Sequence, residues 1–448
     1  MRLLTKLALL AFLTITAQAD PVPPIPPNHG QPEPQQHRLS PSPNTASHSQ
    51  PDGSGSSAHG TGVSTPFFAS LERTARLVDI TYCVGTTGIA PPFSCVSRCS
   101  EFPALQLLRT WNTGVLLSDS CGYIAVDHGG GRRRVGEARG RGRGREGEWG
   151  GEGDDGIVGE GKEIVVAFRG TYSVTNTIVD LSTVPQEYVP YPAPPGGDGN
   201  DDDGDGDGKC DNCTVHMGFM ASWRNAREVV IPALKAAREK YPGYRVHLVG
   251  HSLGGAVAAL AALEVRLGLG WRDVVVTTFG EPRVGNGKLA EYVDRAFGLL
   301  AQKDSEDLAY RRVTHVGDPV PLLPLSEWGY RSHAGEVYIG KSDLPPGPAD
   351  LRLCRGDDDP ECMGGAETAD WLGWVLGLMK RERTHEVEAL ELERGWFPAR
   401  LKLWQLFFAH RDYFWRLGLC LPGGDPADWG REKYNLTLDE SRDEIRDL

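Results

Sequence analysis

The sequence predicts an α/β protein whose mostly parallel central sheet has helices on both faces. Short apolar strands alternate along the chain with helices. Strands in such an alternation pair in parallel, and the helices between them cover both faces of the sheet. A Gly-His-Ser-Leu-Gly pentapeptide, residues 250–254, lies between one of these strands and the next helix. The chain therefore presents a serine at the edge of the sheet where strand ends deliver functional groups.

The predicted elements follow one another in a regular order. An amphipathic helix over 65–78 begins the folded part and leads into Tyr82 and Cys83. The later elements are a strand at 163–168, a helix at 217–240, a strand at 244–249, a helix at 256–267, and strands at 273–279 and 312–316. The strand at 163–168 is a continuous run of β-branched and apolar residues, which is typical of a strand buried on both faces.

The N-terminus has the features of a secretory signal peptide over residues 1–19. Two basic residues precede an apolar run at 7–15, and a small-residue cleavage site, Ala-Gln-Ala, ends at residue 19. A cytosolic amphipathic helix is the alternative. The apolar stretch at 371–379 is shorter than the roughly 20 residues that a membrane span needs. We therefore expect a secreted, extracellular protein with no transmembrane span.

Length alone allows two or three domains, but much of the 448-residue chain cannot pack. Residues 20–66 are rich in Pro, Ser and Gly and poor in apolar residues. Such a segment cannot offset the entropy of ordering, so we expect a disordered leader. One domain at 67–440 follows, with low-complexity inserts at 128–162 and 194–209 and an extended region at 363–405.

The two inserts allow other interpretations that their sequences disfavour. An arginine-glycine run in the first insert could bind RNA. The chain has a formal net charge of -13, which argues against a nucleic-acid partner and favours a solvated loop. The aspartates at 198–207 resemble the start of a calcium loop, yet the twelfth position is Lys209, Asn212 or Thr214 and never the required glutamate. We expect no metal site here.

The pentapeptide has the form of a nucleophile elbow with Ser252 at its tip. The turn forces the serine backbone into a strained conformation, and a side chain on either neighbouring glycine would collide with the strand or helix. The helix N-terminus behind the serine favours a developing negative charge. A glycine-rich loop is the alternative in a chain with 56 glycines. The flanking strand and helix favour the elbow.

An elbow serine needs a general base, and the base needs an acid partner that holds its tautomer. Such residues follow the chain order Ser, Asp, His. Asp318 directly follows a predicted strand, although a turn aspartate before Pro319 is the alternative reading. Among the histidines beyond it, His333, His385 and His410, we prefer His410. His385 lies in a charged helical run that is expected to face solvent.

Five motifs then occur in a characteristic order. They are Val-Val-Ala-Phe-Arg-Gly-Thr at 165–171, Gly-His-Ser-Leu-Gly-Gly at 250–255, Thr-Phe-Gly-Glu-Pro-Arg-Val-Gly-Asn at 278–286, Gly-Asp-Pro-Val-Pro at 317–321 and His-x-x-Tyr-Phe at 410–414. Together they resemble the class 3 lipases, the secreted fungal triacylglycerol lipases and their feruloyl esterase relatives. The resemblance covers about 67–420 apart from the inserts.

This resemblance implies an α/β-hydrolase fold and a specific set of functional residues. Ser252 would be the nucleophile, His410 the general base and Asp318 its partner. The backbone amides of Thr171 and Leu253 would form the oxyanion hole, with help from the Thr171 hydroxyl. Fixed donors suit acyl transfer, because the carbonyl oxygen gains charge in the tetrahedral state.

Nine cysteines in a secreted chain indicate disulfides with one thiol left over. Spacing suggests the local pairs Cys95 with Cys99, Cys210 with Cys213, and Cys354 with Cys362. The resemblance implies a long bridge between Cys83 and Cys420, which leaves Cys121 as the odd cysteine. Two segments, at Asn212 and Asn435, fit the glycosylation sequon. The first is expected to be blocked if its middle cysteine is bridged, so Asn435 is the expected glycosylation site.

The segment at 172–185 follows the expected oxyanion residue, where related lipases carry a lid helix. Val174, Ile178 and Leu181 share one helical face and could shield the serine in water. A short core helix is the alternative. Thr177 stands where several relatives have tryptophan, which argues against strong interfacial activation. The apolar helical face in 364–406 could enlarge the lid or cover the core.

These observations predict a serine esterase that cleaves the acyl esters of glycerides through an acyl-serine intermediate. We expect a monomer that meets its lipid ester substrate at an oil–water interface and needs no metal or organic cofactor. A feruloyl esterase acting on plant cell-wall esters would use the same residues. A secreted lipid-binding protein without activity is the alternative from another functional class.

Overall fold

The computed structural model describes residues 62–114, 119–129, 162–170, 185–187, 210–301, 305–356, 359–364 and 408–431. All of them belong to the unit His59–Leu448. The expected signal peptide and lid face lie outside the described residues. So do nearly all of the leader, of both inserts and of the extended region at 363–405.

The core of the molecule is an eight-stranded sheet with the strand order β1-β2-β3-β6-β7-β9-β11-β12. Its strands are β1 (Leu105–Asn112), β2 (Cys121–Asp127), β3 (Glu163–Phe168), β6 (Arg245–His251), β7 (Val274–Phe279), β9 (Tyr310–His315), β11 (Glu336–Ile339) and β12 (Leu351–Leu353). The five strands from β3 to β11 run parallel. Antiparallel pairs form both edges. The mostly parallel sheet predicted from the sequence is therefore confirmed.

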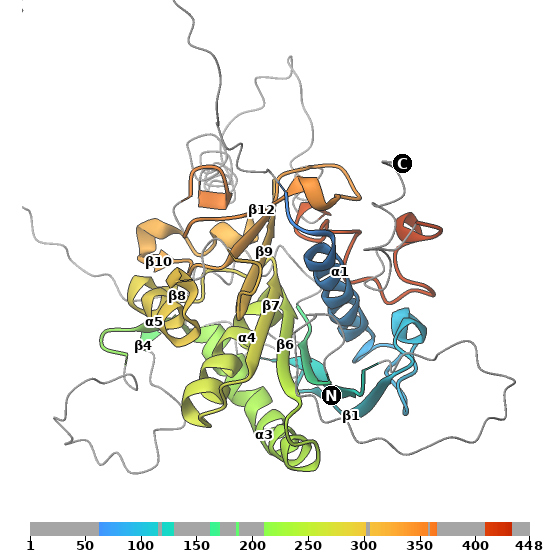
Figure 1. Ribbon diagram of the computed structural model, residues 1–448. Coiled ribbons are helices and arrows are strands. Elements are labelled where there is room, and N and C mark those ends of the chain that lie inside the picture. Colours follow the sequence, from blue (N-terminus) through green and yellow to red (C-terminus); the bar gives the residue numbers. More distant parts are fainter. Residues whose placement is uncertain are drawn as a thin grey trace, which may run out of the picture. The chain divides into compact units, whose positions relative to one another are not determined.

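The described residues form four α-helices: α1 (Thr65–Ile80), α3 (Met217–Lys240), α4 (Leu253–Leu263) and α5 (Gly287–Phe297). A π-helical turn, Glu264–Gly268, extends α4. In Figure 1, α1 (blue) lies on one side of the strands and α4 and α5 (yellow) lie on the other. None of the helices in the described residues is long and apolar enough to cross a membrane.

Alternate residues of the central strands enter two separate cores. In β3, Ile164, Val166 and Phe168 pack with α3, α4 and α5. Val165 and Ala167 pack on the opposite face with α1 and the segment after His410. Successive strand side chains point to opposite faces, so helices on both sides bury every position of such a strand. Burial on both faces explains why the sequence of β3 is a continuous apolar run.

Short elements complete the described structure. The second sheet contains β4 (Pro185–Glu187), β5 (Thr214–His216), β8 (Gly285–Asn286) and β10 (Tyr330–Arg331). Single 3₁₀ turns lie at Thr81–Cys83, Arg98–Glu101, Leu299–Ala301, Val320–Leu322, Ser326–Trp328, Pro348–Asp350 and Pro426–Asp428. Residues 128–162 join β2 to β3, whose ends Asp127 and Glu163 are paired, so this insert connects two adjacent antiparallel strands.

Several predicted boundaries were wrong by a few residues. Helix α4 begins at Leu253 and not at 256, because Ser252 itself is the N-cap residue. Strand β9 begins at Tyr310 and not at 312. The folded part begins before residue 67, because the Ser64 side chain accepts a hydrogen bond from Phe67 N and caps α1.

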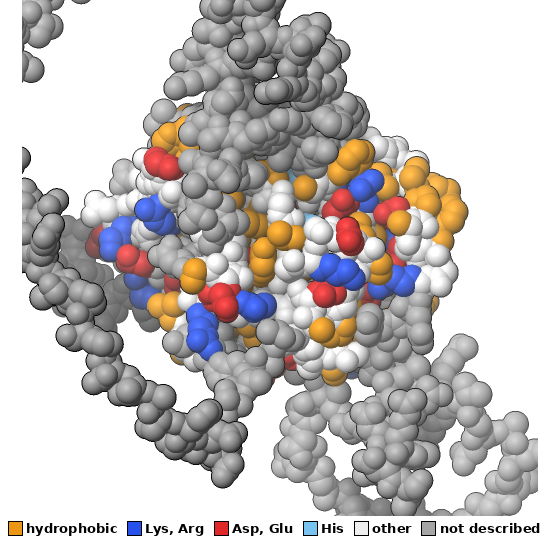
Figure 2. Space-filling view, turned by 90° about the horizontal axis from the view of Figure 1, so that it is seen from above, with side chains coloured by type: hydrophobic (Ala, Val, Ile, Leu, Met, Phe, Trp, Pro, Cys, Tyr) orange, Lys and Arg blue, Asp and Glu red, His pale blue; other side chains and the backbone are white. Residues whose placement is uncertain are grey.

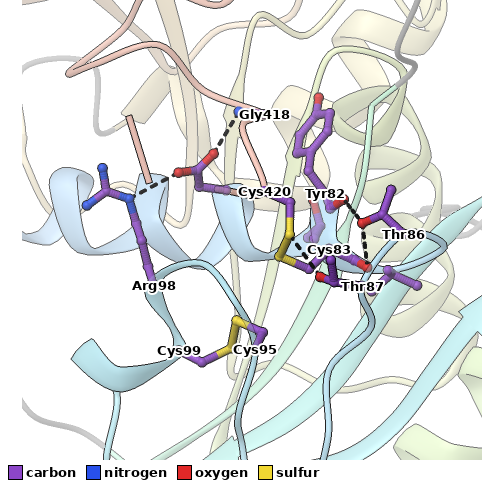
Figure 3. The surroundings of a disulfide bond; sticks show 12 residues. Tyr82, Cys83, Thr86, Thr87, Cys95, Arg98, Cys99, Gly418 and Cys420 are labelled. Atoms are coloured by element: carbon purple, nitrogen blue, oxygen red, sulfur yellow. Dashed lines mark hydrogen bonds and ion pairs between the residues drawn. A yellow bond between two sulfur atoms is a disulfide. The ribbon is translucent and has the colours of Figure 1, made fainter. Parts of the chain in front are cut away.

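Four disulfides are present, Cys83–Cys420, Cys95–Cys99, Cys210–Cys213 and Cys354–Cys362, and Cys121 is a buried free thiol. These are the pairs that spacing and resemblance suggested. Figure 3 shows the first two close together, with Cys83 directly after Tyr82. The long bridge ties the end of the first helical segment to the chain just beyond His410.

The surface of the described residues mixes apolar and charged groups. Figure 2 shows one face, on which hydrophobic side chains lie between basic and acidic ones. The large apolar side chains that are exposed are Val96, Met217, Leu300, Trp328, Leu421 and Trp429. Exposed apolar side chains of this kind are common on folded proteins and do not by themselves identify a binding surface.

Candidate active site

Ser252 lies at a sharp turn between β6 and α4. Its φ of 58° and ψ of -132° are a conformation that L-residues rarely adopt. The turn is tight: a Cβ on Gly250 would lie 2.2 Å from the Gly254 oxygen, and one on Gly254 would lie 2.5 Å from the Phe168 oxygen. Only glycine fits at these two positions. The structure thus contains the predicted elbow.

His410 and Asp318 form a buried pair. Nδ1 of His410 lies 2.9 Å and 3.0 Å from the two carboxylate oxygens of Asp318. Two further donors hold this carboxylate, the amide of Val320 at 2.9 Å and the phenol of Tyr413 at 2.5 Å. A carboxylate only accepts hydrogen bonds, so Nδ1 carries the proton and Nε2 is left as the basic nitrogen.

Nε2 of His410 has no hydrogen-bond partner within the described part of the chain, although it is buried. A buried polar atom without a partner costs free energy, and such atoms recur at functional sites. A basic nitrogen in this condition is suited to accept a proton from a nucleophile or a bound water.

His410 lies close to the elbow, beside the ends of β6 and β7. The ring of His251, the residue before Ser252, stacks on the His410 ring with centroids 4.7 Å apart. The amide of Ser252 donates to the Phe279 oxygen at 2.9 Å. Gly280 follows directly, and a Cβ there would lie 2.9 Å from Cε1 of His410 and 3.0 Å from Oδ2 of Asp318. The three predicted residues therefore meet where β6, β7 and β9 end.

The expected oxyanion hole is described in part. Leu253 is the first residue of α4, so its amide has no acceptor inside the helix. Thr171 lies outside the described residues, as do the expected lid residues. Gly170, just before it, lies next to the serine: a Cβ on Gly170 would come within 2.9 Å of the Ser252 Cβ. The end of β3 is therefore adjacent to the elbow, where a second donor would be needed.

Burial shapes the charges around the site. Burial, with the neighbouring His410 as a smaller cause, holds the pKa of His251 well below its usual range. Burial and the charge of Asp318 raise the pKa of the Tyr413 phenol well above its ordinary value. Both groups are consequently neutral near pH 7. The Tyr413 phenol remains a donor, and His251 adds no positive charge beside His410.

Three residues of this site were not predicted from the sequence: Tyr82, His251 and Tyr413. His251 and Tyr413 lie within the motifs at 250–255 and 410–414, which by themselves indicate no role for these two side chains. The alternative base His333 is buried elsewhere, between the Ala334 oxygen and the Glu281 carboxylate. His385 lies outside the described residues.

The remaining predictions from the sequence concern a metal site and two glycosylation sequons. The described residues contain no cluster of three or more His, Cys, Asp or Glu side chains able to hold a metal ion. Asn212 is exposed at a turn with a φ of 59°. Asn435 lies outside the described residues, so its glycosylation stays a prediction.

Comparisons with known proteins agree with this geometry. A family model described as Lipase (class 3) matches residues 165–328. "Secreted mono- and diacylglycerol lipase 2" of Gibberella zeae is 57% identical over 374 residues, which cover 83% of this chain and 86% of that protein. "Lipase A" of Sodiomyces alcalophilus is 57% identical over 378 residues, with the same two coverages of 83% and 86%.

Comparison with a solved lipase structure supports the same family. The Lip2 lipase from Yarrowia lipolytica aligns with a TM-score of 0.57 at 26% identity, over 82% of this chain and 99% of that one. The chain therefore has the α/β-hydrolase fold and belongs to the class 3 lipase family.

Proposed function

We propose that this protein is a secreted serine esterase that hydrolyses the ester bonds of glycerides with Ser252 as nucleophile, His410 as base and Asp318 as the partner of the base. The observation that carries the proposal is the state of the His410 ring. Its Nδ1 is held by Asp318, and its buried Nε2 is free to act next to the elbow.

The reaction has two halves. As Oγ of Ser252 bonds to the ester carbonyl carbon, its proton passes to Nε2 of His410 and the carbonyl electron pair moves onto oxygen. The tetrahedral intermediate collapses, and the departing glycerol oxygen takes that proton. Water then attacks the acyl-serine with the same base, and the fatty acid leaves. Asp318 keeps its charge throughout and stabilises the imidazolium that forms twice.

The oxyanion is held by the amide of Leu253 and by the amide and hydroxyl of Thr171. Helix α4 supports the first donor, because its N-terminus points at the developing charge. The segment at 172–185 acts as a lid, with Val174, Ile178 and Leu181 on its apolar face. We propose that the enzyme works as a monomer at the surface of the lipid.

The substrate class follows from the relatives, one of which is named for mono- and diacylglycerol and is secreted. We place glycerides first and aromatic cell-wall esters second. Purified protein should be given mono-, di- and triglyceride emulsions and methyl ferulate in parallel, with Ser252→Ala as the control. Preferred hydrolysis of methyl ferulate would replace the lipid assignment. Lipid binding without hydrolysis by either protein would establish a binding protein.

A further inference from the structure

His251, the residue before the nucleophile, lies in direct contact with His410. Its ring is 1% exposed, and the two imidazole planes lie 27° apart with their centroids at 4.7 Å. Nε2 of His251 is 2.9 Å from the backbone oxygen of His410. One ring therefore holds both the main chain and the side-chain plane of the proposed base.

The direction of these hydrogen bonds is fixed by chemistry. A carbonyl oxygen only accepts, so Nε2–H of His251 donates to His410. The ring is neutral, so its Nδ1 is the acceptor and takes a hydrogen bond from the Tyr82 phenol at 2.6 Å. The phenol thus selects the tautomer that can hold His410.

Tyr82 is itself well anchored. It is buried in the short helical turn after α1 and directly precedes Cys83, which is bridged to Cys420 (Figure 3). A Cβ on Gly170 would lie 2.7 Å from the Tyr82 oxygen. The phenol therefore sits between the end of β3 and the His410 segment, and it contacts both sides of the site.

We propose that His251 and Tyr82 are positioning residues for the hydrolysis, which together hold the His410 imidazole in line with Ser252. His410 lies on the C-terminal segment and Ser252 at the turn after β6, so no local geometry relates them. His251 connects the two residues, because it directly precedes Ser252 in the chain and its ring contacts His410. This inference rests on the proposed function of Ser252 and His410.

The test compares His251→Leu with His247→Leu. His247 is a matched control: it lies four residues earlier on β6, is buried, and has both ring nitrogens bonded, to Glu163 and Thr277. Each variant is assayed on a soluble short-chain ester, with kcat referred to active sites titrated by an activated phosphonate. His251→Leu should lower kcat by roughly 10- to 100-fold, a part of what a general base contributes. Its KM should change by less than about threefold.

Two further variants separate positioning from stability. His251→Gln keeps a donor toward the His410 oxygen and should recover most of the lost kcat. Tyr82→Phe should lower kcat by roughly 3- to 10-fold, the effect of one lost hydrogen bond. Its control, Tyr123→Phe, loses a bond of the same kind to the Leu77 oxygen. Tyr82→Phe also decides the question if His251→Leu does not fold.

The outcomes are distinct. If both His251→Leu and Tyr82→Phe keep kcat within about threefold of their controls, the positioning role is wrong. A loss that appears mainly in KM, or that glutamine does not restore, also overturns it. If Ser252→Ala retains the activity of the wild type, the proposed function fails and this inference fails with it. An inactive Ser252→Ala beside a His251→Leu whose kcat stays within about threefold of its control removes the positioning role alone.

Discussion

The phenol of Tyr413 donates a hydrogen bond to Oδ2 of Asp318 at 2.5 Å, three residues after the histidine that the same carboxylate holds. One short segment therefore contacts Asp318 twice. The carboxylate accepts from His410, Tyr413 and the Val320 amide, and this fixes its plane.

Tyr413→Phe should lower kcat/KM by roughly 10- to 100-fold, because a hydrogen bond to a charged group contributes roughly 1.5 to 3 kcal/mol. Steady-state kinetics on a soluble ester measures the effect. Tyr310→Phe is the control, since Tyr310 also donates to a buried carboxylate, that of Glu281, away from the site. Equal losses in the two variants would contradict a specific role for Tyr413.

Asp318→Asn should lower kcat by roughly 10³- to 10⁴-fold, because an amide at this position favours the wrong tautomer of the His410 ring. The fold should be retained, since asparagine has nearly the same shape. Kinetics and circular dichroism together make the test. A variant that is folded and active within about tenfold of the wild type would exclude Asp318 as the partner of the base.

Gly170→Ala should lower kcat by roughly 100-fold, since a displacement near 1 Å at a reacting group costs about that much. The new Cβ would lie 2.7 Å from the His251 oxygen and 2.9 Å from the Ser252 Cβ. Gly340→Ala is the control, because its nearest neighbour would be 3.6 Å away. Unchanged kinetics in Gly170→Ala would mean that β3 does not lie against the elbow in solution.

The stability of the protein should depend on pH through Asp79. This carboxylate accepts from Arg98 at 3.0 Å and from the Gly418 amide at 2.7 Å, and burial raises its pKa from 3.8 to about 6. The folded state then holds the proton more tightly than the unfolded chain. The stabilisation is complete below pH 3.8 and is lost as the pH rises through about 6.

Urea unfolding of the wild type and Asp79→Asn between pH 4 and pH 7 measures this contribution. The difference in unfolding free energy between the two proteins should change by up to about 3 kcal/mol across this range, in the direction of a less stable wild type at higher pH. Parallel pH curves for the two proteins would show that Asp79 does not titrate in this way.

Removing the long disulfide should destabilise the protein more than removing a short one. Cys83 and Cys420 are 337 residues apart, whereas Cys95 and Cys99 are four apart. The double serine variant of the long bridge should lose up to about 6 kcal/mol in the chain-entropy model. Thermal unfolding compares the two variants. A larger fall in Tm for the short bridge would reverse the expectation.

The edge strands and α5 show where prediction from sequence failed. Strand β1 alternates irregularly between buried and exposed positions and has no apolar run to mark it, and β12 has only three residues. Helix α5 is eleven residues long and begins directly after the motif at 278–286, whose last residue, Asn286, is the N-cap residue of the helix. Such elements are stabilised by packing against neighbouring strands and helices. The local pattern of apolar residues in the sequence does not show these contacts.

The sequence by itself determined the parallel centre of the sheet, the elbow at Ser252 and the chain order of Ser252, Asp318 and His410. The first two depend on strand runs buried on both faces and on residues that are close in the chain, and the third on the order in which this fold carries its catalytic residues. Only the tertiary structure decided that His251 stacks on His410 and that Tyr82 directs it. These contacts join residues 159 and 169 positions apart, so packing and not local periodicity sets them.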